Sequence, residues 1–364
     1  MTPTALDYVA RLAPYVPGKP IEDVARELHL DPSTIVKLAS NENPRGPSPK
    51  VLAAIAAAAA EVTRYPDGFG YHLKDALAAR LQVTPSQLVL GNGSNDILEL
   101  ATMAYLKPGD AAVYSKHAFA VYPLATHARG ATGIEVPARD LGHDLAAMRD
   151  AITPQTRVLF VANPNNPTGT WIPPAELEAF IASIPPHVLV VLDEAYNEYL
   201  EPADRADSVA WIAKHPNLLV SRSFSKAYGL AALRVGYGVT SEGVSDMMNR
   251  VRQPFNVNSL AQAAAVAALE DTAYVEESRA MNREGLAQLY RGFDALGLEY
   301  VRSHGNFVLV KVGDAARIDA ALLRKGVIVR PVAGYALPEW LRVSVGLPGE
   351  NERFLSALRE ILGR

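Results

Sequence analysis

From about residue 85 to residue 240 the chain alternates short apolar runs with stretches whose apolar residues recur at helical spacing, such as DILELATMAYL (96–106). This alternation predicts an α/β fold, with a mostly parallel seven-stranded sheet between helices. The predicted strands lie at 88–91, 111–115, 134–138, 157–163, 188–196, 218–224 and 234–239. Ligands of such sheets bind beyond the carboxyl ends of the strands, so polar residues at those ends are the candidates for ligand binding and catalysis.

The pattern changes near residue 258. A long helical region (259–296) is followed by shorter strands and helices, which is typical of a smaller α+β domain. The first residues are rich in proline and irregular. We therefore expect an N-terminal arm (1–35), a large domain (36–258) and a small C-terminal domain (259–364) that packs with the arm.

The composition excludes several classes of function. With 49% hydrophobic and 20% charged residues the chain is an ordinary folded protein, and a formal charge of −4 gives no basic field for nucleic acid or an anionic membrane. The absence of cysteine excludes disulfides and thiolate metal sites, and the eight histidines lack ligand spacing, so we expect no metal.

The start of the chain lacks the features of a signal peptide, and the apolar stretch 51–62 is too short to span a bilayer. We read 51–62 as an alanine-rich surface or packing helix and the protein as cytoplasmic.

The first strand end with candidate chemistry is LVLGNGSNDILEL (88–100), where a strand leads through Gly93, Ser94 and Asn95 directly into a helix. Bare amides at a helix N-terminus, together with the helix dipole, bind phosphate. A tight strand-to-helix turn explains the glycines equally well, so this signal is weak alone.

The next two strand ends carry an amide and a carboxylate. In VANPNNPTGT (161–170) the prolines force an extended turning loop that holds Asn166, whose amide can donate to an oxyanion, although an Asx-turn is the alternative. In VVLDEAY (190–196) Asp193 ends a very apolar strand and Tyr196 follows. Burying a carboxylate there costs free energy unless a cation or a hydrogen-bond donor lies next to it, which indicates a binding site. The alternative interpretation is that Asp193 caps a helix.

The fourth strand end is SFSKAYGLAALRVGY (223–237), in which Lys226 stands among apolar residues. The hydroxyls of Ser223 and Ser225 and the guanidinium of Arg234 can surround a dianion. A desolvated lysine beside other cations has a lowered pKa and becomes a nucleophile toward carbonyls. Together, the four strand ends supply the parts of a pyridoxal phosphate site: a phosphate cup, a carboxylate for the pyridine nitrogen, donors for the phenolate and a lysine for the aldehyde.

The chain resembles the fold-type-I pyridoxal-phosphate-dependent aminotransferases over essentially its whole length, and most closely the histidinol-phosphate aminotransferase family. Besides the strand ends above, the resemblance is carried by LASNENPRGPSP (38–49), RYPDG (64–68) and LRVSVG (341–346). It implies pyridoxal 5'-phosphate as cofactor and transamination of L-histidinol phosphate with 2-oxoglutarate, in histidine biosynthesis and with ping-pong kinetics.

The resemblance also implies roles for cofactor-binding residues. Lys226 matches the Schiff-base lysine that later moves the substrate's proton, and Asp193 matches the partner of the pyridinium. Asn166 and Tyr196 match the donors to the phenolate. The phosphate cup is matched by Gly93, Ser94, Asn95, Ser223, Ser225 and Arg234. Phe119 stands where the family usually has a tyrosine that stacks on the ring, so stacking is kept and a hydroxyl contact is lost.

Other matches concern the substrate and a second subunit. Tyr65 matches a residue that reaches the phosphate of the neighbouring subunit's cofactor, which implies a homodimer with shared active sites; a surface aromatic is the alternative. Arg342 matches the arginine that binds the substrate's acidic group, and Arg330 would face a phosphate together with it, or form a surface ion pair. Tyr15 resembles an arm residue that closes over the substrate, and Asn41 belongs to the same substrate-binding set.

Three alternatives stay open at this stage. An aromatic amino acid aminotransferase would use the same cofactor residues, with Arg342 binding a carboxylate. A pyridoxal-phosphate-dependent decarboxylase on this fold differs only in the orientation of the bond that breaks. A non-catalytic regulator would carry an added DNA-binding domain, for which residues 1–40 are too short and too acidic.

Overall fold

The computed structural model describes residues 3–15 and 17–364. Its main feature is a seven-stranded sheet in the order β2-β8-β7-β6-β5-β3-β4. The strands are β2 (Leu88–Gly91), β3 (Ala111–Ser115), β4 (Thr132–Val136), β5 (Thr156–Ala162), β6 (Leu189–Asp193), β7 (Leu218–Ser223) and β8 (Gly236–Val239). Strand β8 is antiparallel to both its neighbours and every other pair is parallel. Each strand overlaps one of the predicted runs, so the mostly parallel seven-stranded sheet is confirmed.

Helices cover both faces of this sheet, because side chains of a buried strand alternate between two apolar cores. In β6, Val190 and Leu192 belong to one core and Leu189 and Val191 to the other. The first face is covered by α4 (Tyr71–Leu81), α7 (Leu145–Asp150), α8 (Pro174–Ala182) and α11 (Ser259–Glu270). The second face is covered by α5 (Ser94–Tyr105), α6 (Val121–His127) and α10 (Glu242–Val251).

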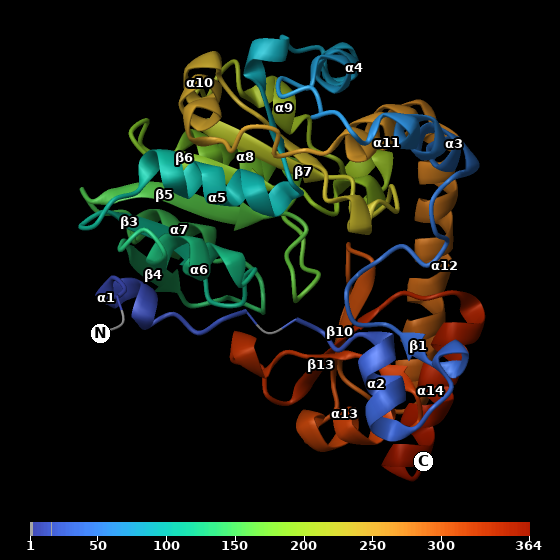
Figure 1. Ribbon diagram of the computed structural model, residues 1–364. Coiled ribbons are helices and arrows are strands. Elements are labelled where there is room, and N and C mark those ends of the chain that lie inside the picture. Colours follow the sequence, from blue (N-terminus) through green and yellow to red (C-terminus); the bar gives the residue numbers. More distant parts are fainter. Residues whose placement is uncertain (1–2, 16) are drawn as a thin grey trace.

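A smaller four-stranded sheet, in the order β12-β13-β10-β9, lies beside the large one. Its strands β9 (Tyr300–Val301), β10 (Phe307–Lys311), β12 (Arg330–Pro331) and β13 (Trp340–Ser344) form antiparallel pairs. Helices α13 (Ala315–Arg324) and α14 (Pro348–Leu362) pack on it. The long helix α12 (Thr272–Ala295) runs between the two parts (Figure 1), with Val275 in the core of the large sheet and Phe293 in that of the small one.

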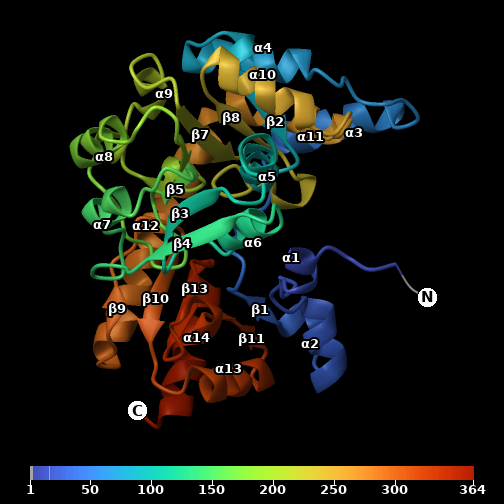
Figure 2. The ribbon, with the colours of Figure 1, turned by 90° about the vertical axis from the view of Figure 1, so that its left-hand side faces the viewer.

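The N-terminal segment lies along both parts of the molecule: residues 7–12 lie beside α6 and β4 of the large sheet, and residues 21–37 lie beside the smaller sheet (Figure 2). After α1 (Asp7–Ala10) and α2 (Ile21–Leu28), strand β1 (Val36–Lys37) pairs in parallel with β11 (Val327–Ile328). The apolar run VIVRP (327–331) is therefore divided between two strands: β11 pairs with the arm, whereas β12 pairs with β13. This split follows from tertiary pairing, which the apolar run does not encode.

The alanine-rich helix α3 (Pro49–Ala58) packs against α11, which is also rich in alanine. Small side chains allow the two helix backbones to approach closely. Helix α11 starts just after residue 258 and contributes Ala261 and Ala264 to the core of the large sheet.

The domain boundaries at residues 35 and 258 stay predictions. Within the described ranges no helix is long and apolar enough to cross a membrane, and the cytoplasmic location also stays a prediction.

Candidate active site

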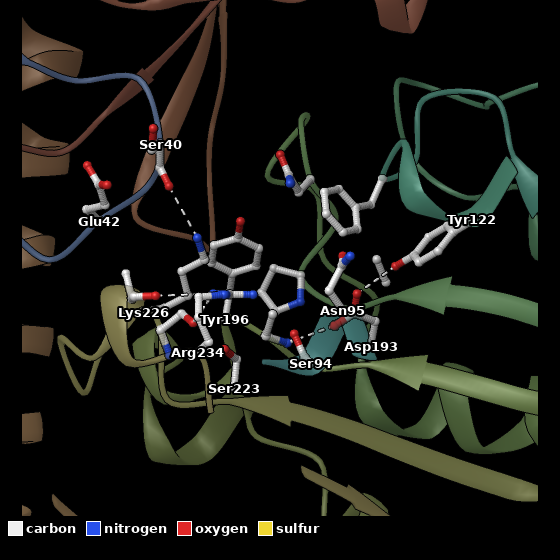
Figure 3. Close-up of a pocket in the computed structure, with 17 residues that line it drawn as sticks. Ser40, Glu42, Ser94, Asn95, Tyr122, Asp193, Tyr196, Ser223, Lys226 and Arg234 are labelled. Atoms are coloured by element: carbon white, nitrogen blue, oxygen red, sulfur yellow. Dashed lines mark hydrogen bonds between the residues drawn. The ribbon is translucent and has the colours of Figure 1, made fainter. Parts of the chain in front are cut away.

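A cavity of about 310 Å³ opens at the carboxyl ends of β5, β6 and β7 (Figure 3). Most of the residues singled out in the sequence meet there. They are Ser94, Asn95, Phe119, Asn166, Asp193, Tyr196, Ser223, Ser225, Lys226 and Arg234. The four strand ends therefore converge, as expected for the open edge of a parallel sheet.

Lys226 is buried in this cavity just after β7. Its Nζ donates a hydrogen bond to the carbonyl oxygen of Ser40 at 3.2 Å and lies 5.8 Å from the centre of the Tyr196 ring. Burial, and next the nearby charge of Arg342, lower the pKa of Lys226 from 10.5 to about 8. About a tenth of this amine is neutral at pH 7, far more than for an ordinary lysine, and the neutral amine is the form that attacks a carbonyl.

Asp193 ends β6 with its carboxyl group inside the cavity. The hydroxyl of Tyr122 donates to Oδ2 at 2.9 Å, and the N–H of Ala195 donates to Oδ1 at 3.2 Å. Burial raises the pKa of Asp193 to about 6, while these two hydrogen bonds lower it. The carboxyl is thus mainly ionised at pH 7, and its buried charge favours a cationic group at this end of the cavity.

A cradle for an anion lies at the start of α5. No side chain caps this helix end, and Arg234 donates from Nη1 to Ser225 Oγ at 3.4 Å and from Nη2 to the Asn92 carbonyl oxygen at 3.4 Å. Gly93 has a φ of 85°, and a Cβ there would lie 2.4 Å from Arg234 Nη2. Glycine is therefore required for the arginine to reach the helix end, where its charge and the free N–H groups together favour a phosphate.

Asn166 and Arg342 meet at the side of the cavity that faces the smaller sheet. Arg342, on β13, donates from Nη1 to Asn166 Oδ1 at 2.6 Å and from Nη2 to the Ala39 carbonyl oxygen at 2.6 Å. Its Nε is buried and has no hydrogen-bond partner in the part of the chain that the structure describes. An unpaired buried donor beside a cavity favours an anionic ligand.

Arg330 and Arg342 are opposite each other on the antiparallel strands β12 and β13. Residues in such a pair project from the same face of the sheet, so the two guanidinium groups lie on one face. Arg330 also lies over the ring of Tyr15, at 5.7 Å from its centre. Asn41 donates from Nδ2 to the Tyr196 hydroxyl oxygen at 2.9 Å, which orients the phenol.

Tyr65 lies apart from this cavity. It is 83% exposed, and its ring stacks on that of Phe255 at 4.8 Å between centres.

Phe119 lines the cavity and meets Tyr122 edge to face. Tyr196 was expected at the end of a strand, but β6 ends at Asp193 and Tyr196 lies in the turn that follows.

Among the residues that line the cavity, the sequence interpretation missed three with polar side chains, namely Ser40, Glu42 and Tyr122. Tyr122 comes three residues after Phe119 in KHAFAVY, so helical spacing was a signal that both rings point the same way. Ser40 acts through its carbonyl oxygen, a group that every residue has, and nothing in its sequence could have marked it.

Comparison with known proteins agrees with this geometry. The family model of class I and II aminotransferases matches residues 33–358. Histidinol-phosphate aminotransferase 1 of Thiobacillus denitrificans is 62% identical over 99% of this chain and 94% of its own length. Histidinol-phosphate aminotransferase 2 of Pseudomonas aeruginosa is 62% identical over 97% of this chain and 96% of its own. The crystal structure of the Sinorhizobium meliloti histidinol-phosphate aminotransferase in complex with pyridoxal-5'-phosphate is 29% identical, with a TM-score of 0.92 over 100% of this chain and 98% of that one.

The chain belongs to the class I and II aminotransferases, and within them to the histidinol-phosphate aminotransferases. It is a pyridoxal-phosphate-dependent enzyme with the fold-type-I architecture. The cavity fits that cofactor, because it offers an uncapped helix end with Arg234 for a phosphate, a buried carboxylate for a pyridinium and a lysine with a lowered pKa for an aldehyde.

Proposed function

We propose that this protein transfers an amino group from L-histidinol phosphate to 2-oxoglutarate, giving imidazole-acetol phosphate and glutamate. The observation that carries this proposal is the pair Arg330 and Arg342, which face the same side of the smaller sheet next to the cavity. Two adjacent guanidinium groups suit a phosphate dianion better than a single carboxylate. The high identity to two histidinol-phosphate aminotransferases supports it.

When bound, pyridoxal phosphate supplies the electron sink that makes the substrate's Cα proton acidic. Lys226 would hold the cofactor's aldehyde carbon and, once released as a neutral amine, would accept the Cα proton and return it to that same aldehyde carbon. Asp193 holds the ring nitrogen in its protonated form. The start of α5, with Ser223, Ser225 and Arg234, holds the phosphate group.

The remaining residues place the substrate. Asn166 and Tyr196 would donate to the phenolate oxygen of the cofactor, and Arg342, which bonds Asn166 in this structure, would bind the substrate's acidic group. Tyr15 is 51% exposed beside Arg330 and is free to close over the substrate. Asn41 keeps the Tyr196 phenol in place through its hydrogen bond.

The comparisons do not favour the aromatic aminotransferase, and the decarboxylase has no relative among those compared above.

The substrate assignment predicts a preference of at least about a hundredfold, or ~3 kcal/mol, in kcat/KM for histidinol phosphate over phenylalanine. Both amino donors are measured with saturating 2-oxoglutarate on the cofactor-loaded enzyme, so that only the donor differs. Comparable values would contradict the proposal and would identify a broad aromatic aminotransferase with the same mechanism.

We also propose that the enzyme is a homodimer in which Tyr65 completes the neighbouring subunit's site. The support is a group of exposed aromatic side chains that would be costly to leave in water. They are Tyr65 at 83% exposure, Phe69 at 80%, Tyr71 at 66% and Phe255 at 45%. Exposed aromatic patches of this kind mark protein–protein interfaces.

The shared site predicts complementation between two inactive proteins. In a mixture of Lys226→Ala and Tyr65→Ala subunits, half the dimers are hybrids and each hybrid has one complete site, so about a quarter of the wild-type activity should return. The two variants are unfolded together, refolded and assayed, with each refolded alone as control. A mass of one chain by light scattering, or no recovery on mixing, would contradict the proposal.

A further inference from the structure

We propose that Tyr122 is a positioning residue for catalysis, whose hydroxyl holds Asp193 as a carboxylate and so keeps the proton on the cofactor's ring nitrogen. This inference rests on the proposed function only in that a pyridine-type cofactor occupies the cavity. Nothing in the sequence interpretation assigned a role to Tyr122.

The first argument is the hydrogen bonding of Asp193. The carboxyl accepts one hydrogen bond from a backbone N–H, that of Ala195, and one from a side chain, the Tyr122 hydroxyl at 2.9 Å. Tyr122 thus supplies the only side-chain donor to Asp193 within residues 3–15 and 17–364. Both bonds favour the charged form, and the bond from Tyr122 lowers the pKa of Asp193 more than the bond from Ala195 does.

The second argument is that the Tyr122 ring cannot move away. It is fully buried, stacks on Phe160 at 4.6 Å between centres with planes 7° apart, and meets the edge of Phe119 at 5.9 Å. Phe160 is on β5, next to the strand that ends in Asp193. Packing therefore holds the hydroxyl against the carboxyl, and the Tyr122 side chain loses little conformational entropy when it forms this hydrogen bond.

The third argument concerns charge. Burial raises the pKa of Tyr122 well above its usual range, and Asp193, Tyr196 and Tyr335 raise it further, so the phenol stays a donor. On Asp193, burial and the neighbouring charge of Glu194 favour the neutral acid, while Lys226 weakly favours the carboxylate. Without the phenol, the carboxyl becomes more basic and competes better for the proton that it shares with the ring nitrogen.

The test uses pyridoxamine 5'-phosphate, which carries an amine in place of the aldehyde and so binds without a covalent link to Lys226. In Tyr122→Phe its dissociation constant should rise about tenfold, because a carboxyl group that is more easily protonated holds the protonated ring nitrogen less tightly. The ring packing is kept by phenylalanine. The control Tyr114→Phe removes a buried phenol from the same core without touching Asp193, and should bind as the wild type does.

A double-mutant cycle separates positioning from packing. If Tyr122 acts through Asp193, Tyr122→Phe has little effect in an Asp193→Asn background, and none on an analogue whose ring nitrogen is replaced by carbon. The ¹⁵N chemical shift of labelled cofactor in Tyr122→Phe should also move toward the value seen in Asp193→Asn. An equal loss of affinity in both backgrounds, or an unchanged affinity and shift, would overturn the proposal. No substrate enters these measurements, so a failed substrate assignment leaves them interpretable.

Discussion

Replacing Lys226 with alanine should lower kcat for transamination by at least about 10⁴-fold, because one side chain both anchors the cofactor and carries the proton. The visible absorption band of cofactor attached to the protein should disappear at the same time. The readouts are steady-state kinetics with histidinol phosphate and the absorption spectrum of the purified protein. Substantial residual activity, or a wild-type protein that binds no cofactor, would contradict the assignment of the site.

The chain offers a matched control for this experiment. Burial also lowers the pKa of Lys74 to about 8, but Lys74 lies near Phe69 and Tyr71, outside the cavity of Lys226. Lys74→Ala should keep the visible band. That result would mean that a lowered pKa is insufficient by itself and that the surrounding acceptors and donors decide which lysine binds the cofactor.

The pH dependence of cofactor capture gives the same prediction a second readout. Below pH 8 most of Lys226 is the ammonium ion, which is not nucleophilic, and above pH 8 most of it is the neutral amine. The rate at which cofactor-free protein attaches pyridoxal phosphate should rise with pH and level off above about 8. Lys226→Ala protein reports any attachment at other lysines. A rate that falls as pH rises from 6 to 8 would contradict the lowered pKa.

The main sheet and half of the site could be predicted because they depend on local signals. Buried parallel strands appear as continuous apolar runs, and the residues that follow them must meet at one edge. Asp193 and Lys226 were recognisable because a charge directly after such a run is costly without a purpose. Family resemblance then supplied roles that the spacing alone left open.

The parts that could not be predicted depend on contacts between distant segments. The hydrogen bond from Lys226 to the Ser40 carbonyl joins residues 186 positions apart, and that from Arg342 to the Ala39 carbonyl joins residues 303 apart. Strand β1 has two residues and exists only because β11 lies beside it. The bond between Tyr122 and Asp193 links a helix to a strand end, and neither local pattern requires it.

Replacing Arg342 with lysine should lower kcat/KM about 10²- to 10³-fold, or ~3–4 kcal/mol, for histidinol phosphate and for phenylalanine alike. Lysine keeps the charge but loses the planar fork that spans Asn166 and Ala39 in this structure. The measurement is kcat/KM for each donor, since in a ping-pong reaction this ratio contains no step that involves 2-oxoglutarate.

The matched variant is Arg330→Gln, on the opposite residue of the neighbouring strand. If the two arginines share a phosphate, Arg330→Gln should lower kcat/KM for histidinol phosphate at least about tenfold and leave phenylalanine nearly unchanged. Arg342 would then bind the acidic group of every substrate, and Arg330 would add the preference for a dianion. Equal losses for both donors in Arg330→Gln would instead mean that Arg330 supports the fold of this strand pair. An Arg342→Lys protein that keeps full activity on phenylalanine would place the carboxylate site elsewhere in the cavity.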